Sequence, residues 1–410
     1  MKYRHVLGVA ALAALTATLL AAPRLRAEPG DDLTIYALTF GPGDHPFFKF
    51  GHNAIWVQPK NVQGLVYNFG TFAFDSPALI PKFLRGKFMY WLSVAGADDT
   101  MEAYASANRS ILAQELDLTP AQRWSLWQAL RVNARPENRE YLYDYFYDNC
   151  STRVRDAIDR VVNGRVHAAG LAPVPMTFRD DALRMTADLW PEAVGIDLAI
   201  GRPADIPLDG WAESFLPERL AELLRVVKVS GATGEKSLVK SERVIHEAVR
   251  PSAPVRPPNR VPYFLVLGLA VGALLFGLGR IGQRSVARVL LGCASSLIGL
   301  VFGFIGLALT CLWAFTNHRI AYTNANILQF APWAAALAVH GIAVALGRAT
   351  AVKRAKALAF SCAALSLLGL LCKILPGVSQ NNWPFVVLAL PIWAGLWAGL
   401  RALPGSHDRR

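Results

Sequence analysis

Residues 141–164 read YLYDYFYDNCSTRVRDAIDRVVNG, and this stretch decides what kind of domain the N-terminal half forms. Apolar residues recur at helical spacing after Cys150, and Gly164 ends the pattern, so the sequence predicts a helix that begins at Cys150. Unpaired backbone N–H groups and the positive end of the helix dipole favour a thiolate there, and Arg153 is expected to strengthen that field. Because the thiolate is the nucleophilic form of cysteine, the stretch predicts a reactive thiol.

The start of the chain indicates that this domain is exported. Lys2 and Arg4 precede an apolar run that ends at Ala22, and polar sequence begins near Glu28. This order is typical of an export signal. The cleavage site is ambiguous, so residues 1–27 are predicted to be a signal peptide or an N-terminal anchor, and either one exports the domain that begins at Glu28.

The second half of the chain is nearly continuous apolar sequence, and 53% of all 410 residues are hydrophobic. We expect about five membrane spans, each near the ~20 residues that cross a bilayer: Pro262–Leu278, Val289–Phe315, Leu328–Leu346, Ala357–Leu375 and Trp383–Leu400. The predicted plan is therefore an exported domain at 28–225, a basic, proline-containing tether at 226–260, a transmembrane domain at 261–403 and a cytoplasmic tail at 404–410.

The distribution of cations orients these spans. Lysines and arginines fill the first and third connections and follow the last span, whereas the second connection, 316–327, carries only Arg319 and His318. By the positive-inside rule the 28–260 segment lies outside the cytoplasm, in agreement with the signal. The cytoplasmic loops account for many of the cations behind the net charge of +12. An exported domain seldom meets nucleic acid, so nucleic acid is not an expected partner.

Cys150 is the one exported cysteine, because the other four fall within predicted spans: Cys293, Cys311, Cys362 and Cys372. A single cysteine in an oxidising compartment cannot form an internal disulfide. It is therefore either a buried residue without a chemical role or a reactive thiol, and its position at a predicted helix start favours the reactive thiol.

His52 is the preferred candidate for the base that would activate this thiol. It lies in the strand-like run 50–57, and a second strand-like run, 65–70, can place Asn68 beside the imidazole to orient it. The other exported histidines lie in predicted turn, loop or tether sequence: His45, His167 and His246. From spacing alone, a surface histidine is an equally good interpretation of His52.

Two further polar groups are candidates for binding substrate. The connection 316–327 returns to the Cys150 side of the membrane, and its polar residues could hold a phospholipid headgroup or a lipid-modified peptide: His318, Tyr322, Asn324 and Asn326. An ordinary polar loop is an equal alternative. The alternating tyrosines of 141–147 could line a groove beside Cys150, although strand packing is the plainer interpretation.

Segments 50–55, 66–72, 83–90 and 143–156 resemble the Lnb-type lipoprotein N-acyltransferases, a bacterial family formerly of unknown function. The resemblance continues through 177–179, 195–205, 215–217 and 315–328, and so covers most of the chain. It implies an α+β fold, in which a circularly permuted papain-like (NlpC/P60-type) exported domain is followed by an all-α membrane domain. The family order, histidine before cysteine, matches His52 and Cys150.

The resemblance also implies an activity. A thiol acyltransferase of this type, in the bacterial inner membrane with its catalytic domain in the periplasm, would move an acyl chain from a membrane phospholipid through a Cys150 thioester. The acceptor would be the N-terminal amine of diacylglyceryl lipoproteins. His52 and Asn68 would complete the catalytic group, and the expected substrate contacts are Asn149, Arg153, His318, Asn324 and Asn326. The sequence contains no metal-binding cluster, Walker loop or dinucleotide fingerprint, so no metal or other cofactor is expected.

Two other classes of function remain open. In a cysteine hydrolase acting on lipid or peptide bonds, water would replace the acceptor amine, because a papain-like fold does not fix function. In a non-enzymatic membrane receptor or binding module, Cys150 would be structural. Only the last class predicts that Cys150→Ser leaves function intact.

Overall fold

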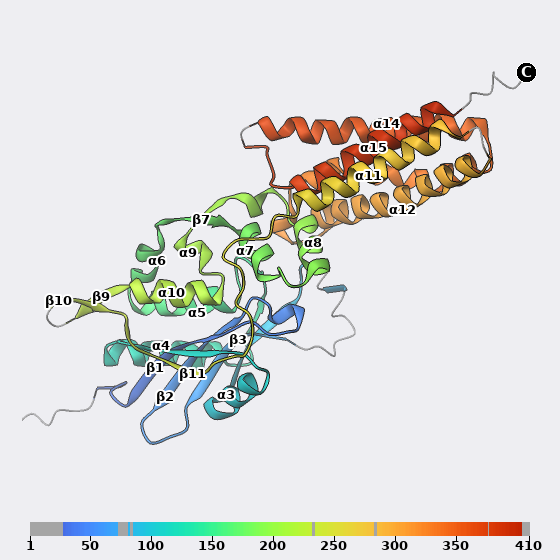
Figure 1. Ribbon diagram of the computed structural model, residues 1–410. Coiled ribbons are helices and arrows are strands. Elements are labelled where there is room, and N and C mark those ends of the chain that lie inside the picture. The colour runs from blue at the N-terminus through green and yellow to red at the C-terminus, as the bar shows by residue number, and fades with distance from the viewer. Residues whose placement is uncertain are drawn as a thin grey trace, which may run out of the picture.

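The computed structural model describes residues 28–72, 81–82, 85–231, 234–282, 285–375 and 377–403. The predicted signal or anchor, 1–27, and the predicted tail, 404–410, lie outside the described residues. A sheet-rich domain stands at one end of the molecule and a bundle of long helices at the other (Figure 1). This division confirms the predicted mixed α and β class, with a helical C-terminal region.

The N-terminal domain is built on a seven-stranded antiparallel sheet with the order β11-β5-β1-β2-β3-β4-β6. Its strands are β1 (Leu33–Phe40), β2 (His52–Pro59), β3 (Leu65–Thr71), β4 (Met89–Gly96), β5 (Ile111–Leu116), β6 (Glu140–Leu142) and β11 (Val239–His246). Alternate residues of β1 enter cores on opposite faces, Ile35 on one side and Leu38 on the other. The sheet is therefore covered on both sides.

Helices α4 (Pro120–Asn133), α5 (Cys150–Val161) and α10 (Pro217–Val226) pack on one face, and α3 (Ala97–Ser106) packs on the other. Thr119 and Gln122 form a capping box at the start of α4. The remaining elements of the domain are short: η1 (Pro46–Phe48), α6 (Arg165–Gly170), β7 (Pro173–Thr177), α7 (Phe178–Met185), α8 (Trp190–Ala199), η2 (Arg202–Asp205), β8 (Pro207–Asp209), α9 (Gly210–Glu213), β9 (Lys228–Gly231) and β10 (Gly234–Ser237).

The segment predicted as a tether, 226–260, is a tether only in part. Strands β9 and β10 pair with each other, and β11 pairs with β5 at the edge of the main sheet. The Lys240 ammonium lies 2.6 Å from the Glu115 carboxylate, and Arg225 lies 2.8 Å from Glu242. Exposed edge strands commonly carry charged residues, as solvated linkers also do. The composition of β11 therefore resembles that of a linker. The connection to the membrane helices is confined to 247–260.

Four helices of the C-terminal region are long and apolar enough to span a membrane, and a bent pair of segments would make a fifth span. The long helices are α11 (Val261–Arg280), α12 (Ser285–Phe315), α14 (Ala349–Leu371) and α15 (Trp383–Ala402). A Cβ on Gly272 would lie 2.4 Å from the Pro391 carbonyl oxygen, and one on Gly395 would lie 2.1 Å from that of Gly272. Small residues therefore let α11 and α15 approach closely.

The third predicted span, Leu328–Leu346, is not one straight helix. It consists of η4 (Ala325–Leu328), η5 (Pro332–Ala336) and α13 (Leu337–Ala345), with a bend of 55°. Pro332 has no N–H to continue a helix through this point. The indole of Trp393 donates a hydrogen bond to the Gln329 carbonyl oxygen at 2.9 Å, which satisfies one of the backbone groups at the break.

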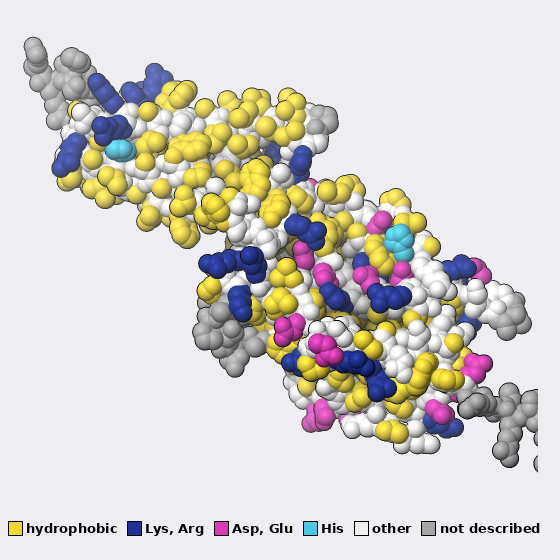
Figure 2. Space-filling view, turned by 180° about the vertical axis from the view of Figure 1, so that it is seen from behind, with side chains coloured by type: hydrophobic (Ala, Val, Ile, Leu, Met, Phe, Trp, Pro, Cys, Tyr) yellow, Lys and Arg dark blue, Asp and Glu magenta, His cyan; other side chains and the backbone are white. Residues whose placement is uncertain are grey.

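Two connections between the membrane helices lie against the N-terminal domain. In the first, which runs from η3 (Arg319–Ala321) to η4, the Asn324 side chain donates a hydrogen bond to the Leu198 carbonyl oxygen. In the second, which runs from η6 (Cys372–Ile374) to α15, the Asn381 backbone N–H donates to the Asp205 carboxylate. Lysines and arginines gather at the opposite end of the bundle (Figure 2). The geometry therefore agrees with the topology predicted from charge.

Candidate active site

Helix α5 begins at Cys150, as the sequence predicted, and Asn149 is its cap. The Asn149 Oδ1 accepts a hydrogen bond from the Thr152 amide at 2.9 Å, and its Nδ2 donates to the carbonyl oxygens of Tyr145 and Phe215. The prediction that Asn149 contacts substrate is corrected, because its buried side chain is already saturated with protein partners. It positions the cysteine instead.

A second buried contact ties the start of α5 to strand β2. The Ser151 hydroxyl lies 2.7 Å from both Asn53 Oδ1 and the Ser214 carbonyl oxygen. The amide of Asn53 in turn donates to the Leu38 carbonyl oxygen at 3.0 Å. The backbone groups of Asn53, Ser151 and Cys150 itself lower the pKa of the Cys150 thiol, against the effect of burial. The sulfur therefore sits among backbone donors from two elements.

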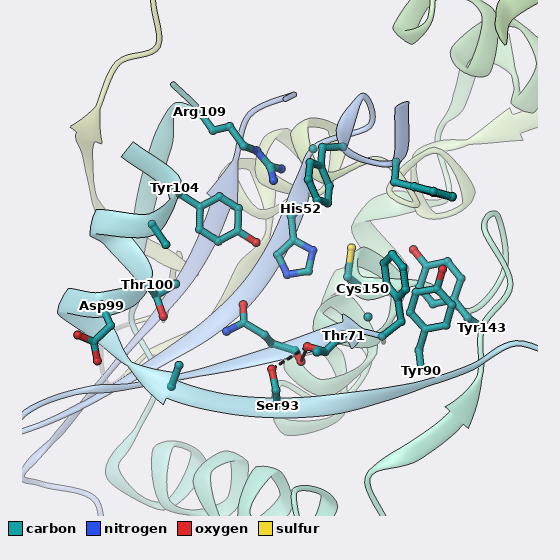
Figure 3. A pocket seen from close by; sticks show the side chains of 18 of the residues that line it. His52, Thr71, Tyr90, Ser93, Asp99, Thr100, Tyr104, Arg109, Tyr143 and Cys150 are labelled. Carbon is teal, nitrogen blue, oxygen red and sulfur yellow. Dashed lines mark hydrogen bonds between the residues drawn. The ribbon is translucent and has the colours of Figure 1, made fainter. Parts of the chain in front are cut away.

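The structure brings Cys150, His52 and Asn68 together in one cavity of about 410 Å³. Residues 55–57 of β2 pair with residues 65–67 of β3, and the two strands diverge beyond this paired region. Helix α5, which begins at Cys150, contacts both strands. Gly70 adopts a φ of +85°, a left-handed conformation that favours glycine, with its backbone against Cys150. Figure 3 shows the His52 imidazole beside the Cys150 sulfur.

The charge states of the pair are set by burial. Desolvation, assisted by the positive charge of Arg109, lowers the pKa of His52 to about 3. The Asn68 side chain opposes this shift by favouring the protonated ring, although its Oδ1 makes no hydrogen bond of good geometry with a described residue. Burial raises the pKa of Cys150 above its ordinary value, against the effects of the backbone N–H groups and Arg109. These shifts disfavour the predicted thiolate and favour an uncharged thiol beside an uncharged imidazole.

This charge state predicts a pH dependence. We expect the rate of Cys150 alkylation by iodoacetamide to rise about tenfold per pH unit from pH 7 to pH 9, because only the thiolate reacts. No inflection is expected near pH 6.5, since the imidazole stays neutral there. Peptide mapping by mass spectrometry separates Cys150 from the membrane cysteines. A rate that is already constant below pH 8 would contradict the neutral pair and restore the thiolate.

Arg109 is a site residue that the sequence did not reveal. It follows α3, is 5% exposed, and donates from Nε to the Gly41 carbonyl oxygen at 2.8 Å. Its guanidinium lies over the rings of Tyr104 and Phe48, with 4.6 and 5.3 Å to the ring centroids, and it lines the cavity. A lone cation before a buried strand carries no recognisable motif, so only the fold identifies it.

Aromatic side chains form the opposite wall of the cavity. The rings of Tyr90 and Tyr143 stack with 4.0 Å between centroids, and the hydroxyl oxygens of Tyr90 and Tyr145 lie 3.4 Å apart. Burial raises the pKa of Tyr90 to about 12, so its phenol stays neutral. Of the alternating tyrosines, Tyr143 and Tyr145 line the cavity, whereas Tyr141 belongs to the core.

Arg153 does not take the role predicted for it. Its guanidinium forms two hydrogen bonds with the Asp148 carboxylate, at 2.5 and 2.7 Å, and lies 4.0 Å from the centroid of the Tyr141 ring. It does not line the cavity, and its charge is compensated by Asp148. The cation that acts on Cys150 is Arg109.

Asn324 and Asn326 are corrected from substrate contacts to anchors between the two domains. Both amides donate to the Leu198 carbonyl oxygen at the end of α8, at 2.9 and 3.0 Å, and both side chains are buried. His318 also lies outside the cavity lining, next to the backbone of Gly86. The polar composition of this loop therefore reflects a buried junction, where every backbone carbonyl needs a donor.

Arg179 is the central residue of this junction and was not singled out from the sequence as a site. Its side chain is 1% exposed and pairs with the carboxylates of Asp197 and Asp205, both at 2.7 Å. It also donates to three backbone carbonyl oxygens, those of Asp197, Ile200 and Gly201. Asp205 accepts a further hydrogen bond from the Asn381 amide, so the network reaches the membrane domain.

A cysteine and a histidine buried together at a helix start, in a domain docked on membrane-spanning helices, define a membrane protein with an extracytoplasmic thiol site. Residues 23–183 match the model of the family described as the Lnb N-terminal periplasmic domain. This match agrees with the family that the sequence resembles, and the protein is a multi-pass membrane protein with a periplasmic domain. No curated protein and no solved structure matches the chain.

Proposed function

We propose that this protein is a membrane-bound thiol acyltransferase of the bacterial inner membrane. It would take an acyl chain from a membrane phospholipid and pass it to the N-terminal amine of diacylglyceryl lipoproteins. The observation that carries the proposal is the shared cavity of Cys150 and His52, walled by tyrosines and placed in a domain docked on membrane helices. The match to the Lnb periplasmic domain supports it.

In the first step the neutral His52 takes the Cys150 proton as the sulfur attacks the ester carbonyl carbon. A neutral thiol needs such a base, and the lowered pKa of His52 keeps its imidazole unprotonated at neutral pH. The backbone N–H groups of Asn53 and Ser151 would stabilise the tetrahedral oxyanion. Collapse breaks the carbon–oxygen bond, and His52 returns the proton to the leaving lysophospholipid.

In the second step the acceptor amine attacks the thioester carbonyl carbon. His52 accepts a proton from the attacking nitrogen, the carbon–sulfur bond breaks, and the Cys150 thiolate regains a proton from His52. The products are an amide and the original thiol, so the cycle needs no oxidant or additional reactant. Water in place of the amine would give a free fatty acid, and exclusion of water from the buried thiol favours transfer.

The fold proposed for this domain is a circularly permuted papain-like layout. Its support is the chain order, with His52 at the start of a central strand and Cys150 at the start of the helix packed on the sheet. The sheet edge formed by β11 adds a strand from after the cysteine helix. Asn68 on β3 would take the place of the group that orients the imidazole.

Intact mass measurement tests this function. After incubation with a defined phospholipid, the purified protein is expected to gain one acyl mass, which then moves to a diacylglyceryl lipopeptide. Cys150→Ser should show no thioester, and Cys362→Ser, which alters a buried membrane cysteine, is the matched control. A thioester that decays only to fatty acid would indicate a hydrolase. No adduct with folded protein would contradict the acyl-enzyme.

A further inference from the structure

We infer that Arg109 binds the phosphodiester of the acyl donor and thereby sets which way the lipid lies across Cys150. The inference rests on the proposed function, because it assigns a binding residue for the same acyl donor. It also goes beyond that function, because it names a residue that decides donor specificity. Arg109 lies outside the cysteine and histidine segments from which the site was recognised.

The first argument is that the Arg109 charge is buried without compensation. The side chain is 5% exposed, and its Nη2 has no hydrogen-bond partner among the described residues. The guanidinium forms no ion pair in the described part of the chain, and its one hydrogen bond goes to the Gly41 carbonyl oxygen. Leaving a buried cation unpaired is costly, which argues that an anion completes the site when substrate binds.

A neighbouring cation strengthens the argument. Arg250 donates to the Asn108 carbonyl oxygen at 3.0 Å, next to Arg109 in the chain. Burial lowers the pKa of Arg109, and the charge of Arg250 adds to this shift. The carboxylate that pairs with Arg250 belongs to Asp44, which is 87% exposed. A second guanidinium therefore lies close to Arg109, outside the cavity lining, and the only carboxylate paired with either arginine in the described residues is the exposed Asp44.

The second argument is the polarity of the cavity. In Figure 3, Arg109 and Tyr104 stand on one side, Tyr90 and Tyr143 on the other, and His52 and Cys150 between them. A ligand that satisfies both ends has an anionic group, an apolar portion and a reactive carbonyl between the two. A glycerophospholipid has this order, because its phosphate and its ester carbonyls branch from the same glycerol.

The third argument is the chemistry of the guanidinium. Its planar fork of donors matches the paired oxygens of a phosphodiester, and such hydrogen bonds are stronger than neutral ones. The guanidinium lies over the rings of Tyr104 and Phe48, and its Nη2 has no hydrogen-bond partner among the described residues, so this donor is left for the ligand. A ligand phosphate at this edge would place the acyl chain toward the tyrosine wall.

A protection experiment tests the inference without any acyl transfer. The full-length protein in detergent micelles is alkylated at Cys150 in the presence of a dihexadecyl ether phosphatidylglycerol, which has no ester to attack. Dihexadecyl ether glycerol, which lacks the phosphate, is the comparison. We expect the ether phospholipid to give half-maximal protection at a concentration at least about tenfold lower.

Variants test whether Arg109 is responsible for the stronger protection by the ether phospholipid. Arg109→Gln should bring the ratio of the two half-protection concentrations close to one, and Arg109→Lys should keep part of it. Arg243→Gln is the matched control, because this arginine also lies over two aromatic rings, those of Tyr36 and Trp56, outside the cavity. It should keep the wild-type ratio.

Equal protection by the two ether lipids in the wild-type protein would overturn the inference, and this arm needs no variant to fold. A phosphate preference that survives in Arg109→Gln would overturn it as well. If an ester phospholipid acylates Cys150 but the two ether lipids protect it equally, the role inferred for Arg109 is contradicted and the proposed transferase function is not. If protection depends on the phosphate but no acyl-enzyme forms, the transferase function is contradicted and the phosphate-binding site is not.

Discussion

Replacing His52 by glutamine is expected to lower the rate of Cys150 acylation by about 10²- to 10⁴-fold, the range that a positioned general base contributes. The expected loss is large because burial raises the pKa of Cys150, so few molecules carry a thiolate without help. Glutamine approximates the volume of the imidazole and retains a polar group, but it cannot accept the thiol proton. The neutral His52 is the one base placed beside the sulfur in Figure 3.

The measurement is the time course of acyl-enzyme formation by intact mass, with the same phospholipid for each variant. His167→Gln is the control, because His167 packs edge-on against Trp211, away from the cavity. It should acylate at the wild-type rate. Wild-type kinetics in His52→Gln, with an unchanged melting temperature, would show that another group removes the thiol proton.

Replacing Arg179 by methionine is expected to destabilise the protein by about 3–5 kcal/mol, the cost of removing one partner from a buried ion pair. The carboxylates of Asp197 and Asp205 would lose the cation that holds them, and three carbonyl oxygens would lose their donor. Burial already raises the pKa of Asp197 despite the neighbouring guanidinium. Without Arg179 we expect the junction between the domains to loosen as well.

Thermal unfolding of the purified protein in detergent checks this prediction, together with the rate of proteolysis in the 247–260 connection. Arg202→Met is the control, because Arg202 lies in η2, the element that carries Asp205, but is exposed. Its melting temperature should stay near that of the wild type. An Arg179→Met protein as stable as this control would show that the network contributes nothing net to folding.

Local signals were enough to predict several parts of the fold. Asn149, Cys150 and Gly164 bound one helix in the sequence, and the structure starts α5 at the cysteine. The run that contains His52 is a strand, because its consecutive apolar residues, 54–57, favour a strand that is buried on both faces of a sheet. Apolar length alone predicted α11, α12, α14 and α15, since the bilayer sets the length of a spanning helix.

Other predictions failed because they depended on what surrounds a residue. The sequence predicts a linker where β11 lies, since an exposed edge strand and a solvated connection share the same charged composition. It also predicts substrate contacts at Asn324 and Asn326, but carbonyl oxygens at the end of α8 occupy their amides. The third span breaks near Pro332, where Trp393 from a distant helix supplies a donor.

The sequence by itself determined which cysteine is the candidate nucleophile, which histidine is the preferred candidate base, and on which side of the membrane both are expected to lie. These follow from helix periodicity, strand patterning and loop charge, which are properties of neighbouring residues. Only the tertiary structure decided that burial raises the pKa of Cys150, that Arg109 rather than Arg153 lines its cavity, and that Arg179 joins the domains. The reason is physical: desolvation and ion pairing depend on residues far apart in the chain, and no local pattern records which of them meet.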